Sequence, residues 1–440
     1  MNLKRLNLKF LKNFHRSNMN NILGNIAYYS DETISISELN LSSYVTTESL
    51  LTNKQGKCDS VKLPPNSEKC TSFKKGDILV ANIRPYLKKI WLADIDGGCS
   101  ADVLVFKCKE GILPSFLYYS LLRDDFFVHS MKGSTGTKMP RGDKDHLLEF
   151  LIPDFDYAKQ EKISQVLSVL DAKIILNNKI NIELEAMAKL IYDYWFVQFD
   201  FPNENGKPYK SSGGKMVYNE DLNQEIPNDW EVCPLREWLT SEKSGDWGKE
   251  SAQDNHTIKV TCIRGSDLSG LNGEEEEKAP TRFIHQNNKD RVLSNFDMII
   301  EISGGSPTQS TGRIAAITPG LQNRFQNPLI CSNFCKPISM NDSDYFYNFL
   351  YQWKNFYSTG LLFKWEGKTS GIKNLLFENF VDNYKTIKPP KEIAKNFNKL
   401  ILSLEEKKQN LLIEIKELKS LRDWLLPMLM NGQVTVSEGS

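Results

Sequence analysis

The chain has 440 residues, 40% of them hydrophobic and 25% charged, which is ordinary for a globular protein of two or three domains. Its 55 basic and 55 acidic residues balance, so it lacks the overall positive charge typical of nucleic-acid-binding proteins, although a local basic surface remains compatible with this count. No apolar run approaches the roughly 20 residues of a membrane span, and the opening "MNLKRLNLKFLKNFHR" has no signal-peptide cleavage site. We therefore expect a cytoplasmic protein.

The first predicted domain covers residues 1–155 and is rich in β-strand patterns. In "FKKGDILVANIRPYLKKIWLADI" (73–95), Asp77 precedes a β-rich run and basic residues occupy the loop that follows. An aromatic helix and a loop of Gly, Thr and Lys come next, in "FLYYSLLRDDFFVHSMKGSTGTKMPR" (116–141). The domain closes with "LLEFLIPDF", which contains Pro153.

The same order of features returns in the second predicted domain, residues 228–390. Asp297 precedes the β-rich segment "LSNFDMIIEISGGSPTQSTGRIAAIT", and an aromatic helix with a Gly/Thr/Lys loop follows at 346–375. Pro389 stands where Pro153 stands in the first domain. The spacing between matched features drifts by several residues, as loop insertions would produce. The sequence therefore indicates an internal repeat.

Each domain is followed by a long helical pattern, at 156–199 and at 391–427. A connector rich in Gly, Pro, Asn and Ser, residues 200–227, lies between the first helix and the second domain. Apolar residues of the second helix recur every seven positions, which is typical of a coiled coil. Two amphipathic helices that each cover their own domain are the alternative. The expected seam residues are Ile163, Leu167, Leu170, Ile174, Asn177, Ile180, Leu184, Met187 and Ile191 in the first helix, and Phe397, Ile401, Leu404, Leu411, Ile415, Leu418 and Leu425 in the second.

The pattern predicts an α+β fold, with two pseudo-repeated β-rich domains separated by two long helices that form an antiparallel coiled coil. Helices of roughly 35 residues, at about 1.5 Å per residue, would be on the order of 50 Å long and would act as a spacer. A C-terminal tail, residues 428–440, would follow the distal helix.

No set of residues predicts a catalytic or metal site. The segment "GSTGTKMP" (133–140) lacks the spacing of a P-loop, and neither a GxGxxG after a strand nor the Asn-Pro-Pro-aromatic motif of amino-methyltransferases occurs. The eight cysteines form no CxxC pair, and no histidine complements Cys331 and Cys335 at zinc spacing. We predict reduced thiols and a non-catalytic chain without a cofactor, with a nuclease built from dispersed acidic residues as the alternative.

Four loops combine basic residues with Gly, Ser and Thr at equivalent places in the two domains. In such loops backbone N–H groups can approach phosphates, and Arg or Gln side chains can pair with base edges. Ordinary solvated turns are the alternative for any single loop, but the recurrence favours binding of double-stranded DNA. The candidate DNA-binding residues are Arg84, Tyr86, Lys88, Lys89, Lys132, Ser134, Thr135, Thr137, Lys138, Arg141, Ser306, Thr308, Gln309, Ser310, Arg313, Lys364, Lys368, Thr369 and Lys373.

The chain resembles the specificity subunit of Type I restriction-modification enzymes from end to end. The resemblance is carried by "IYDYWFVQFDFP" (191–202), "MVYNEDLNQEIPNDWEVCPL" (216–235) and "LRDWLLPMLMNGQV" (421–434), and the pattern "GDILVANIRPYLKKIWLAD" (76–94) is also similar. It implies two target-recognition domains that each read one half of a split, asymmetric DNA sequence, while the helices set the unread gap. It also implies two methyltransferase subunits that modify an adenine in each half, and two restriction/translocase subunits. S-adenosylmethionine, ATP and Mg²⁺ would be used by those partners.

The closing "LLPMLMNGQV" holds the position in the second repeat that "YWFVQFDFP" holds in the first. Pro427 should end the helix because it lacks a backbone donor, and the resemblance implies that the tail packs beside the start of the first domain. A methyltransferase subunit would cover the apolar residues of this segment that the first domain leaves exposed. A purely intramolecular cap is the alternative. The candidate partner-interface residues are Trp195, Phe196, Phe199, Trp424, Leu425, Leu426, Met428 and Leu429.

The start of the chain departs from the family pattern. An Ile-Pro-x-x-Trp motif, present in "EIPNDW" (225–230), opens the second domain but has no counterpart before "NILGNIA" (21–27). Two other functional classes compete with the specificity subunit. One is a stand-alone DNA-binding or decoy protein of the same fold, and the other is a coiled-coil scaffold with no DNA role.

Overall fold

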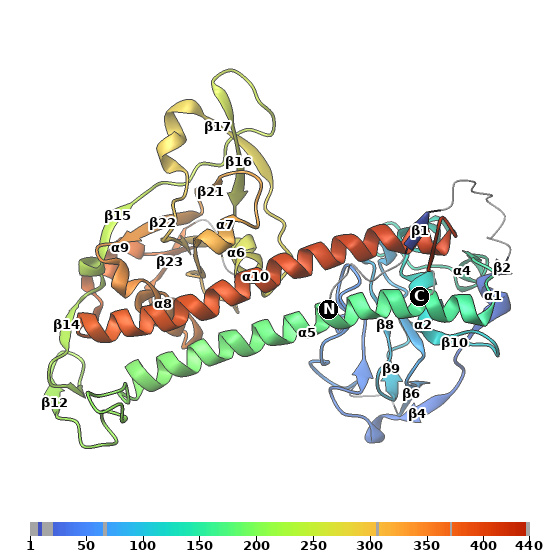
Figure 1. Cartoon of the computed structure of the whole chain (residues 1–440), viewed down its shortest axis with the longest axis horizontal. Coiled ribbons are helices and arrows are strands. Elements are labelled where there is room, and N and C mark those ends of the chain that lie inside the picture. The colour runs from blue at the N-terminus through green and yellow to red at the C-terminus, as the bar shows by residue number, and fades with distance from the viewer. Residues whose placement is uncertain (1–7, 11–20, 65–67, 305–307, 370–371, 437–440) are drawn as a thin grey trace. The chain divides into compact units, whose positions relative to one another are not determined.

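A computed structural model describes residues 8–10, 21–64, 68–304, 308–369 and 372–436 (Figure 1). Contacts between Cα atoms divide the chain into two compact units. Unit 1 comprises Met1–Ile175 and Glu417–Ser440, and unit 2 comprises Leu176–Lys416. Both boundaries fall inside long helices, so each unit contains one β-rich region and part of each helix. This division differs from the predicted domain limits, which set the helices apart as separate segments.

Unit 1 is built on two four-stranded sheets, with strand orders β3-β10-β7-β8 and β4-β6-β9-β5. Its strands are β2 (Asn21–Ile22), β3 (Ala27–Tyr29), β4 (Thr33–Ser35), β5 (Tyr44–Val45), β6 (Lys69–Phe73), β7 (Ile78–Ala81), β8 (Ile90–Leu92), β9 (Gly97–Cys99), β10 (Val103–Cys108) and β11 (Leu151–Ile152). Its short helices are α1 (Leu23–Ile26), α2 (Pro114–Leu121), α3 (Asp124–Lys132) and α4 (Lys144–Leu148). β7 is buried along its whole length because it is a central strand of apolar residues.

Unit 2 repeats this topology. Its main sheet has the order β15-β22-β18-β20, β14 pairs with β25 as β2 pairs with β11, and the parallel pair β16–β21 matches β5–β9. The strands are β14 (Glu231–Pro234), β15 (Leu239–Glu242), β16 (His256–Ile263), β17 (Thr281–His285), β18 (Asp297–Glu301), β19 (Ser303–Gly304), β20 (Ile314–Ala316), β21 (Leu329–Cys331), β22 (Cys335–Met340), β23 (Glu366–Thr369), β24 (Ile372–Leu375) and β25 (Lys385–Lys388). The helices are α6 (Leu268–Leu271), α7 (Pro319–Gln322), α8 (Phe346–Ser358) and α9 (Phe377–Asn383). The predicted internal repeat is confirmed.

The two matched aspartates have the same structural task. The carboxylate of Asp77 accepts the backbone N–H of Lys74 over 2.8 Å, and that of Asp297 accepts the N–H of Ser294 over 2.8 Å. Each contact closes the turn that leads into a central strand, β7 or β18. The repeated aspartate is therefore a turn residue and not a site residue.

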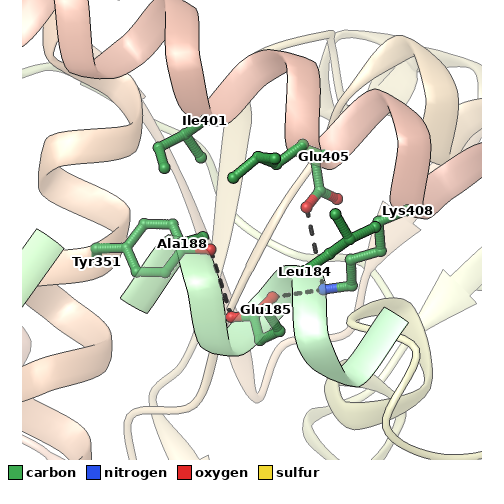
Figure 2. A pocket seen from close by; sticks show the side chains of 8 residues that line it. Leu184, Glu185, Ala188, Tyr351, Ile401, Glu405 and Lys408 are labelled. Carbon is green, nitrogen blue, oxygen red and sulfur yellow. Dashed lines mark hydrogen bonds and ion pairs between the residues drawn. The ribbon is translucent and has the colours of Figure 1, made fainter. Parts of the chain in front are cut away.

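The two long helices, α5 (Tyr157–Tyr192) and α10 (Lys391–Met430), pair in antiparallel fashion. Three cross-helix contacts show the direction, because positions rise along α5 as they fall along α10: Asp171 with Arg422, Asn177 with Glu414, and Glu185 with Lys408 (Figure 2). The predicted α+β fold with an antiparallel helix pair is confirmed.

The seam on α5 follows the prediction from Ile163 to Asn177 and again at Leu184, and it shifts by one residue at the other predicted positions beyond Asn177. Asn181, Ala188 and Tyr192 are buried, whereas three residues predicted on the seam are half-buried or exposed: Ile180, Met187 and Ile191. Because an α-helix has 3.6 residues per turn, the buried positions must be slightly more than 3.5 residues apart on average. A spacing of four residues from Asn177 to Asn181, where three was predicted, keeps the buried stripe facing α10. On α10 the predicted seam is buried except for half-buried Leu404 and Leu411, and Lys408 is buried between Ile401 and Ile415.

Both helices end differently from the prediction. Pro427 lies inside α10, which continues to Met430, so proline removes one hydrogen bond without ending the helix. α5 ends at Tyr192 and passes into a π-helical turn, Asp193–Val197. Such turns widen a helix by one residue and change the direction of its side chains.

The connector 200–227 contains regular structure, contrary to the expectation of turns alone. β12 (Met216–Asn219) and β13 (Gln224–Pro227) form an antiparallel hairpin, whose turn places Asn223 at a positive φ of 52°. Each strand has only four residues, so its alternation of apolar and polar residues cannot be distinguished in the sequence from the surrounding turn residues. At the chain ends, β1 (Leu8–Phe10) pairs in the same way with β26 (Val434–Val436). The expected packing of the tail beside the start of the first domain is confirmed.

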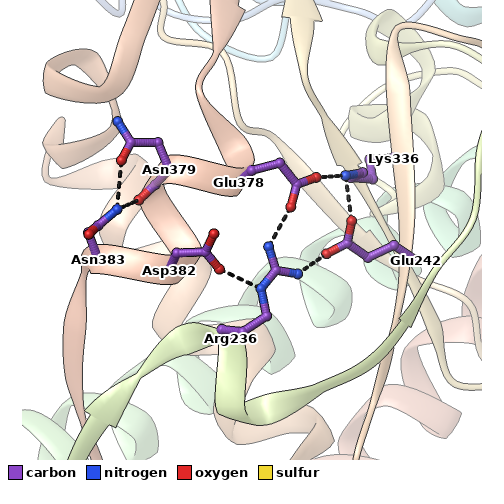
Figure 3. A network of polar contacts seen from close by, with 7 residues as sticks. All are labelled: Arg236, Glu242, Lys336, Glu378, Asn379, Asp382 and Asn383. Carbon is purple, nitrogen blue, oxygen red and sulfur yellow. Dashed lines mark hydrogen bonds and ion pairs between the residues drawn. The ribbon is translucent and has the colours of Figure 1, made fainter.

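A network of charged side chains ties together the elements around β14 in unit 2 (Figure 3). Arg236 donates to Glu242, Glu378 and Asp382, and Lys336 donates to the first two of these carboxylates. These groups join β15, β22 and α9 on a partly exposed surface, where one ion pair contributes at most about 1 kcal/mol. The network lies apart from the predicted DNA-binding residues and orders local structure.

Candidate nucleic-acid interface

In unit 1 the structure brings the two predicted DNA-binding loops together. The backbone N–H of Arg84 donates to the carbonyl of Pro140 over 2.8 Å, and Ile83 forms an antiparallel bridge with Arg141. Arg141 also exchanges two backbone hydrogen bonds with Thr135, of 2.9 and 3.0 Å. Residues 84–89 and 132–141 therefore form one surface at the end of β7.

The turn after β7 holds two residues in left-handed backbone conformations, and the neighbouring segment holds two more. Arg84 (φ 53°) and Lys88 (φ 51°) flank the 3-10 turn Pro85–Leu87, and the neighbouring Asn53 (φ 54°) and Lys54 (φ 62°) donate their N–H groups to the carbonyls of Leu87 and Lys88. Non-glycine residues adopt this conformation at a cost, and such strain concentrates at functional sites. Asn53 and Lys54 are not among the residues predicted from sequence, although the turn pattern "TNKQG" marks them.

The basic side chains beside this turn are partly neutralised. The Nζ atoms of Lys54 and Lys88 lie 2.7 and 2.9 Å from one oxygen of Asp124, the first residue of α3. Burial opposes the charge on Asp124, but the two lysines outweigh it and lower the pKa of this carboxyl. Lys89 points inward, because its Nζ donates to the carbonyl of Thr47, and burial lowers its pKa. Lys88 and Lys89 hold the turn in place.

Other predicted residues of unit 1 face solvent. Tyr86 is 51% exposed at the tip of the turn. Lys132 and Lys138 are exposed, and neither forms an ion pair within the described residues. Arg141 pairs with Asp102, Ser134 donates to the carbonyl of Met131 over 2.7 Å, and Thr135 and Thr137 are exposed. Lys132 and Lys138 are therefore available for phosphates, as is the half-buried Arg84, whose side chain likewise forms no ion pair within the described residues.

In unit 2 the two predicted loops also lie together. The backbone N–H and the hydroxyl of Thr311 donate to Glu366 over 2.7 and 2.8 Å, and β19 pairs with β24. Gly312 has a φ of 113°, and a Cβ atom there would lie 2.3 Å from the side chain of Leu362. Glycine is therefore required where the 304–313 loop packs against the 361–373 segment.

In unit 2, two of the basic residues predicted to bind DNA form ion pairs with glutamates of the same unit. Arg313 makes a bidentate contact with Glu301, at 2.7 and 3.0 Å, and the Nζ of Lys373 lies 3.1 Å from a carboxylate oxygen of Glu366. Both glutamates are nearly inaccessible to solvent, so these pairs stabilise the loops. Thr308, Gln309 and Lys364 are exposed, and Ser310 is buried. Ser306 lies outside the described residues, and Lys368 and Thr369 contribute to β23 through their backbone.

Most of the predicted partner-interface residues fill the chain's own core. The ring of Phe196 lies 4.9 Å from that of Phe397 and 5.9 Å from that of Trp230, and Phe199 contacts the same tryptophan. Leu425, Leu426 and Leu429 are also buried. Only Trp195, Trp424 and Met428 among the eight keep exposed or half-exposed side chains. The burial favours the intramolecular cap for the other five.

Several kinds of site are missing from the described part of the chain. Within it, no group of three or more His, Cys, Asp and Glu residues could hold a metal ion. All eight cysteines are free thiols. Among the residues that the structure describes, no helix is both long and apolar enough to cross a membrane.

Residues 20–186 match the sequence model of the Type I restriction modification DNA specificity domain. The chain is 26% identical over 340 residues to the Type I restriction enzyme MjaIX specificity subunit of Methanocaldococcus jannaschii, covering 75% of this chain and 71% of that one. It is also 26% identical over 449 residues to the HindI specificity subunit of Haemophilus influenzae, covering 89% and 94%. Residues 20–186 therefore carry a Type I restriction modification DNA specificity domain, and the chain as a whole is similar in sequence to Type I restriction enzyme specificity subunits.

The fold agrees with this assignment. The crystal structure of the Type I restriction-modification S subunit from M. genitalium superimposes with a TM-score of 0.55 at 14% identity, covering 98% of both chains. The matched DNA specificity domain contains both loops of the unit 1 surface, residues 84–89 and 132–141.

Proposed function

We propose that this specificity subunit reads a split, asymmetric DNA sequence, with one half contacted by each unit. The observation that carries the proposal is that each unit joins two loops at matching places. In unit 1, an Ile83–Arg141 bridge and a hydrogen bond from Arg84 to Pro140 join 84–89 to 132–141. In unit 2, the β19–β24 pairing and the contact of Thr311 with Glu366 join the described parts of 304–313 and 361–373. The two loop pairs differ in sequence, so the two half-targets should differ as well. The available cations would contact phosphates, and the other exposed side chains would contact base edges.

The helix pair would set the unread gap between the two half-targets. Because α5 and α10 each contribute to both units, the number of residues along them fixes how far apart the reading loops stand along the DNA. The chain itself would carry no chemistry, and its methyltransferase subunits would modify one adenine in each half, with restriction/translocase subunits joining for cleavage.

The outer side of α5 in unit 2 is the surface that we assign to a methyltransferase subunit. Ile182 and Leu190 are 69% and 66% exposed, Ala186 lies between them, and Tyr194 continues the stripe one turn later. These residues follow one another at steps of four along one face of the helix. An exposed apolar stripe on a helix whose opposite side is already buried is typical of a protein interface.

Reconstitution tests this function. The purified chain, incubated with duplex DNA, S-adenosylmethionine, ATP and Mg²⁺, should leave the DNA unchanged. Addition of its methyltransferase subunits should produce methylated adenines in two defined half-sequences at a constant separation. Methyl transfer by the chain alone, or methylation without any sequence preference in the complex, would contradict the proposal.

A further inference from the structure

In unit 2, one carboxylate of α5 joins three helices. Glu185 accepts a hydrogen bond from the Nζ of Lys408 of α10 over 2.7 Å, as Figure 2 shows. It accepts another from the Nζ of Lys354 of α8 over 2.7 Å. The hydroxyl of Tyr351, one turn before Lys354 on α8, donates to the same carboxylate over 3.4 Å. The side chain of Lys408 is 7% exposed, whereas those of Glu185 and Lys354 are 30% and 24% exposed. The junction therefore lies at the edge of the core.

α8 connects this junction directly to the reading loops of unit 2. Trp353, next to Lys354, is completely buried and donates its indole N–H to the carbonyl of Gly312 over 2.7 Å. α8 ends at Ser358, and the chain turns at Gly360 into the 361–373 segment. α8 thus contacts the helix pair through Lys354 and a reading loop through the adjacent Trp353.

Unit 1 contains the same kind of junction. Asp171 of α5 accepts the hydroxyl of Tyr119 from α2 over 2.8 Å and a guanidinium N–H of Arg422 from α10 over 2.8 Å. Tyr119 and Tyr351 both belong to the aromatic helical segments that the internal repeat relates. The acid on α5, the base on α10 and the tyrosine on the recognition helix therefore occur in both units.

In unit 1 too, the recognition helix leads to the reading loops. α3 begins three residues after the end of α2, and its first residue, Asp124, holds Lys54 and Lys88 of the strained turn. α3 ends at Lys132, where the 132–141 loop starts. A displacement of α2 along α5 would move both parts of the reading surface.

We propose that Asp171 and Glu185 are positioning residues, each of which locks the recognition helix of its unit onto the helix pair and keeps the reading loops in place over their half-target. This inference rests on the proposed function. Apolar contacts between helices tolerate small sliding motions, whereas a half-buried carboxylate that accepts hydrogen bonds from two other helices has one favourable geometry. Partly buried ion pairs of this kind contribute little net stability compared with apolar residues of similar size, so we assign them to positioning.

Two substitutions test the inference in the full chain, reconstituted with its methyltransferase subunits. Lys354→Met removes the shorter of the two contacts between Glu185 and α8 and leaves the longer one from Tyr351, and Tyr119→Phe removes the hydrogen bond between Asp171 and α2. The measurement is the methylation rate on cognate duplexes and on duplexes with one altered base pair in either half. Wild-type discrimination should be roughly tenfold or more per altered base pair. Lys354→Met should reduce it at least about threefold in the half read by unit 2 only, and Tyr119→Phe in the half read by unit 1 only.

Two controls separate positioning from general loss of stability. Asn177→Ala removes a hydrogen bond to Glu414 within the helix pair and touches no recognition helix, so it should leave discrimination unchanged at both halves. Lys354→Arg keeps a cation beside Glu185 and should restore discrimination. Unchanged discrimination in both Lys354→Met and Tyr119→Phe, or an equal loss at both halves in either variant, would overturn the inference. If the proposed function itself were wrong, the wild-type complex would show no two-part target sequence for methylation.

Discussion

Arg313 shows how burial changes the role of a basic residue in a predicted DNA-binding loop. Its guanidinium faces Glu301, whose side chain is only 2% exposed. Arg313→Ala would leave a buried carboxylate without its partner, which costs about 3–5 kcal/mol. We expect a clear drop in the thermal unfolding midpoint of the purified chain. An unchanged midpoint with weaker DNA binding would instead identify Arg313 as a direct DNA contact.

Lys138 should behave in the opposite way, because it is exposed and makes no ion pair in the described part of the chain. Lys138→Ala should weaken binding of duplex DNA by the methyltransferase complex and reduce the slope of log affinity against log salt by roughly one, with the unfolding midpoint unchanged. Lys407→Ala, at an exposed position of α10, is the matched control and should change neither quantity. Equal salt slopes for all three proteins would remove Lys138 from the interface.

The ionisation of Glu185 predicts a pH dependence of stability. Burial opposes its charge, but Lys354 and Lys408 outweigh this effect and lower its pKa from 4.5 to about 2. A carboxyl whose pKa is lowered by folding stabilises the native state above its unfolded pKa, and this contribution disappears as pH falls through the folded value. Glu185→Gln should therefore be less stable than wild type at pH 6, and the difference should shrink between pH 4.5 and 2. A difference independent of pH over this range would contradict the assigned ion pairs.

At the scale of elements, α5 is buried on one side and carries a second, exposed apolar stripe on the other. Leu190→Arg introduces a charge into this stripe without touching the core. It should weaken association with a methyltransferase subunit at least about tenfold in a titration, while the unfolding midpoint of the free chain stays within about 1 °C, as expected for a surface change. Glu183→Arg, an exposed position beside the stripe, serves as control and should retain association. Full association of Leu190→Arg would place the partner elsewhere.

The two apolar sides of α5 also explain which parts of the fold could be predicted from sequence. The repeat, the helix pair and the loop positions follow from patterns that are long or that occur twice. The exact seam does not, because Asn181 is buried where Ile180 was the more apolar choice, and because outward apolar residues such as Ile182 and Leu190 blur the period. The inward roles of Lys89, Arg313 and Lys373 were equally hidden, since their acceptors, among them Glu301 and Glu366, become neighbours only through sheet pairing.

At the scale of the whole molecule, α5 and α10 each contribute residues to both units, and in the proposed function their length determines the unread gap. Four residues inserted after Asn177 on α5 and four after Ile413 on α10 would lengthen the pair while keeping the contact between Asn177 and Glu414, and between Glu185 and Lys408, intact. Four residues add about 6 Å and about one helical turn, so the buried stripes stay nearly in phase.

The most direct measurement is a map of methylated adenines in cells that carry either the wild-type chain or this insertion variant with the methyltransferase subunits. The wild-type map should show two defined half-sequences separated by a constant unread gap. In the variant the half-sequences should be the same, and the gap should be wider by about 1–2 base pairs, because DNA rises about 3.4 Å per base pair. An active variant with an unchanged gap, altered half-sequences, or a wild-type map without a two-part target would contradict the account.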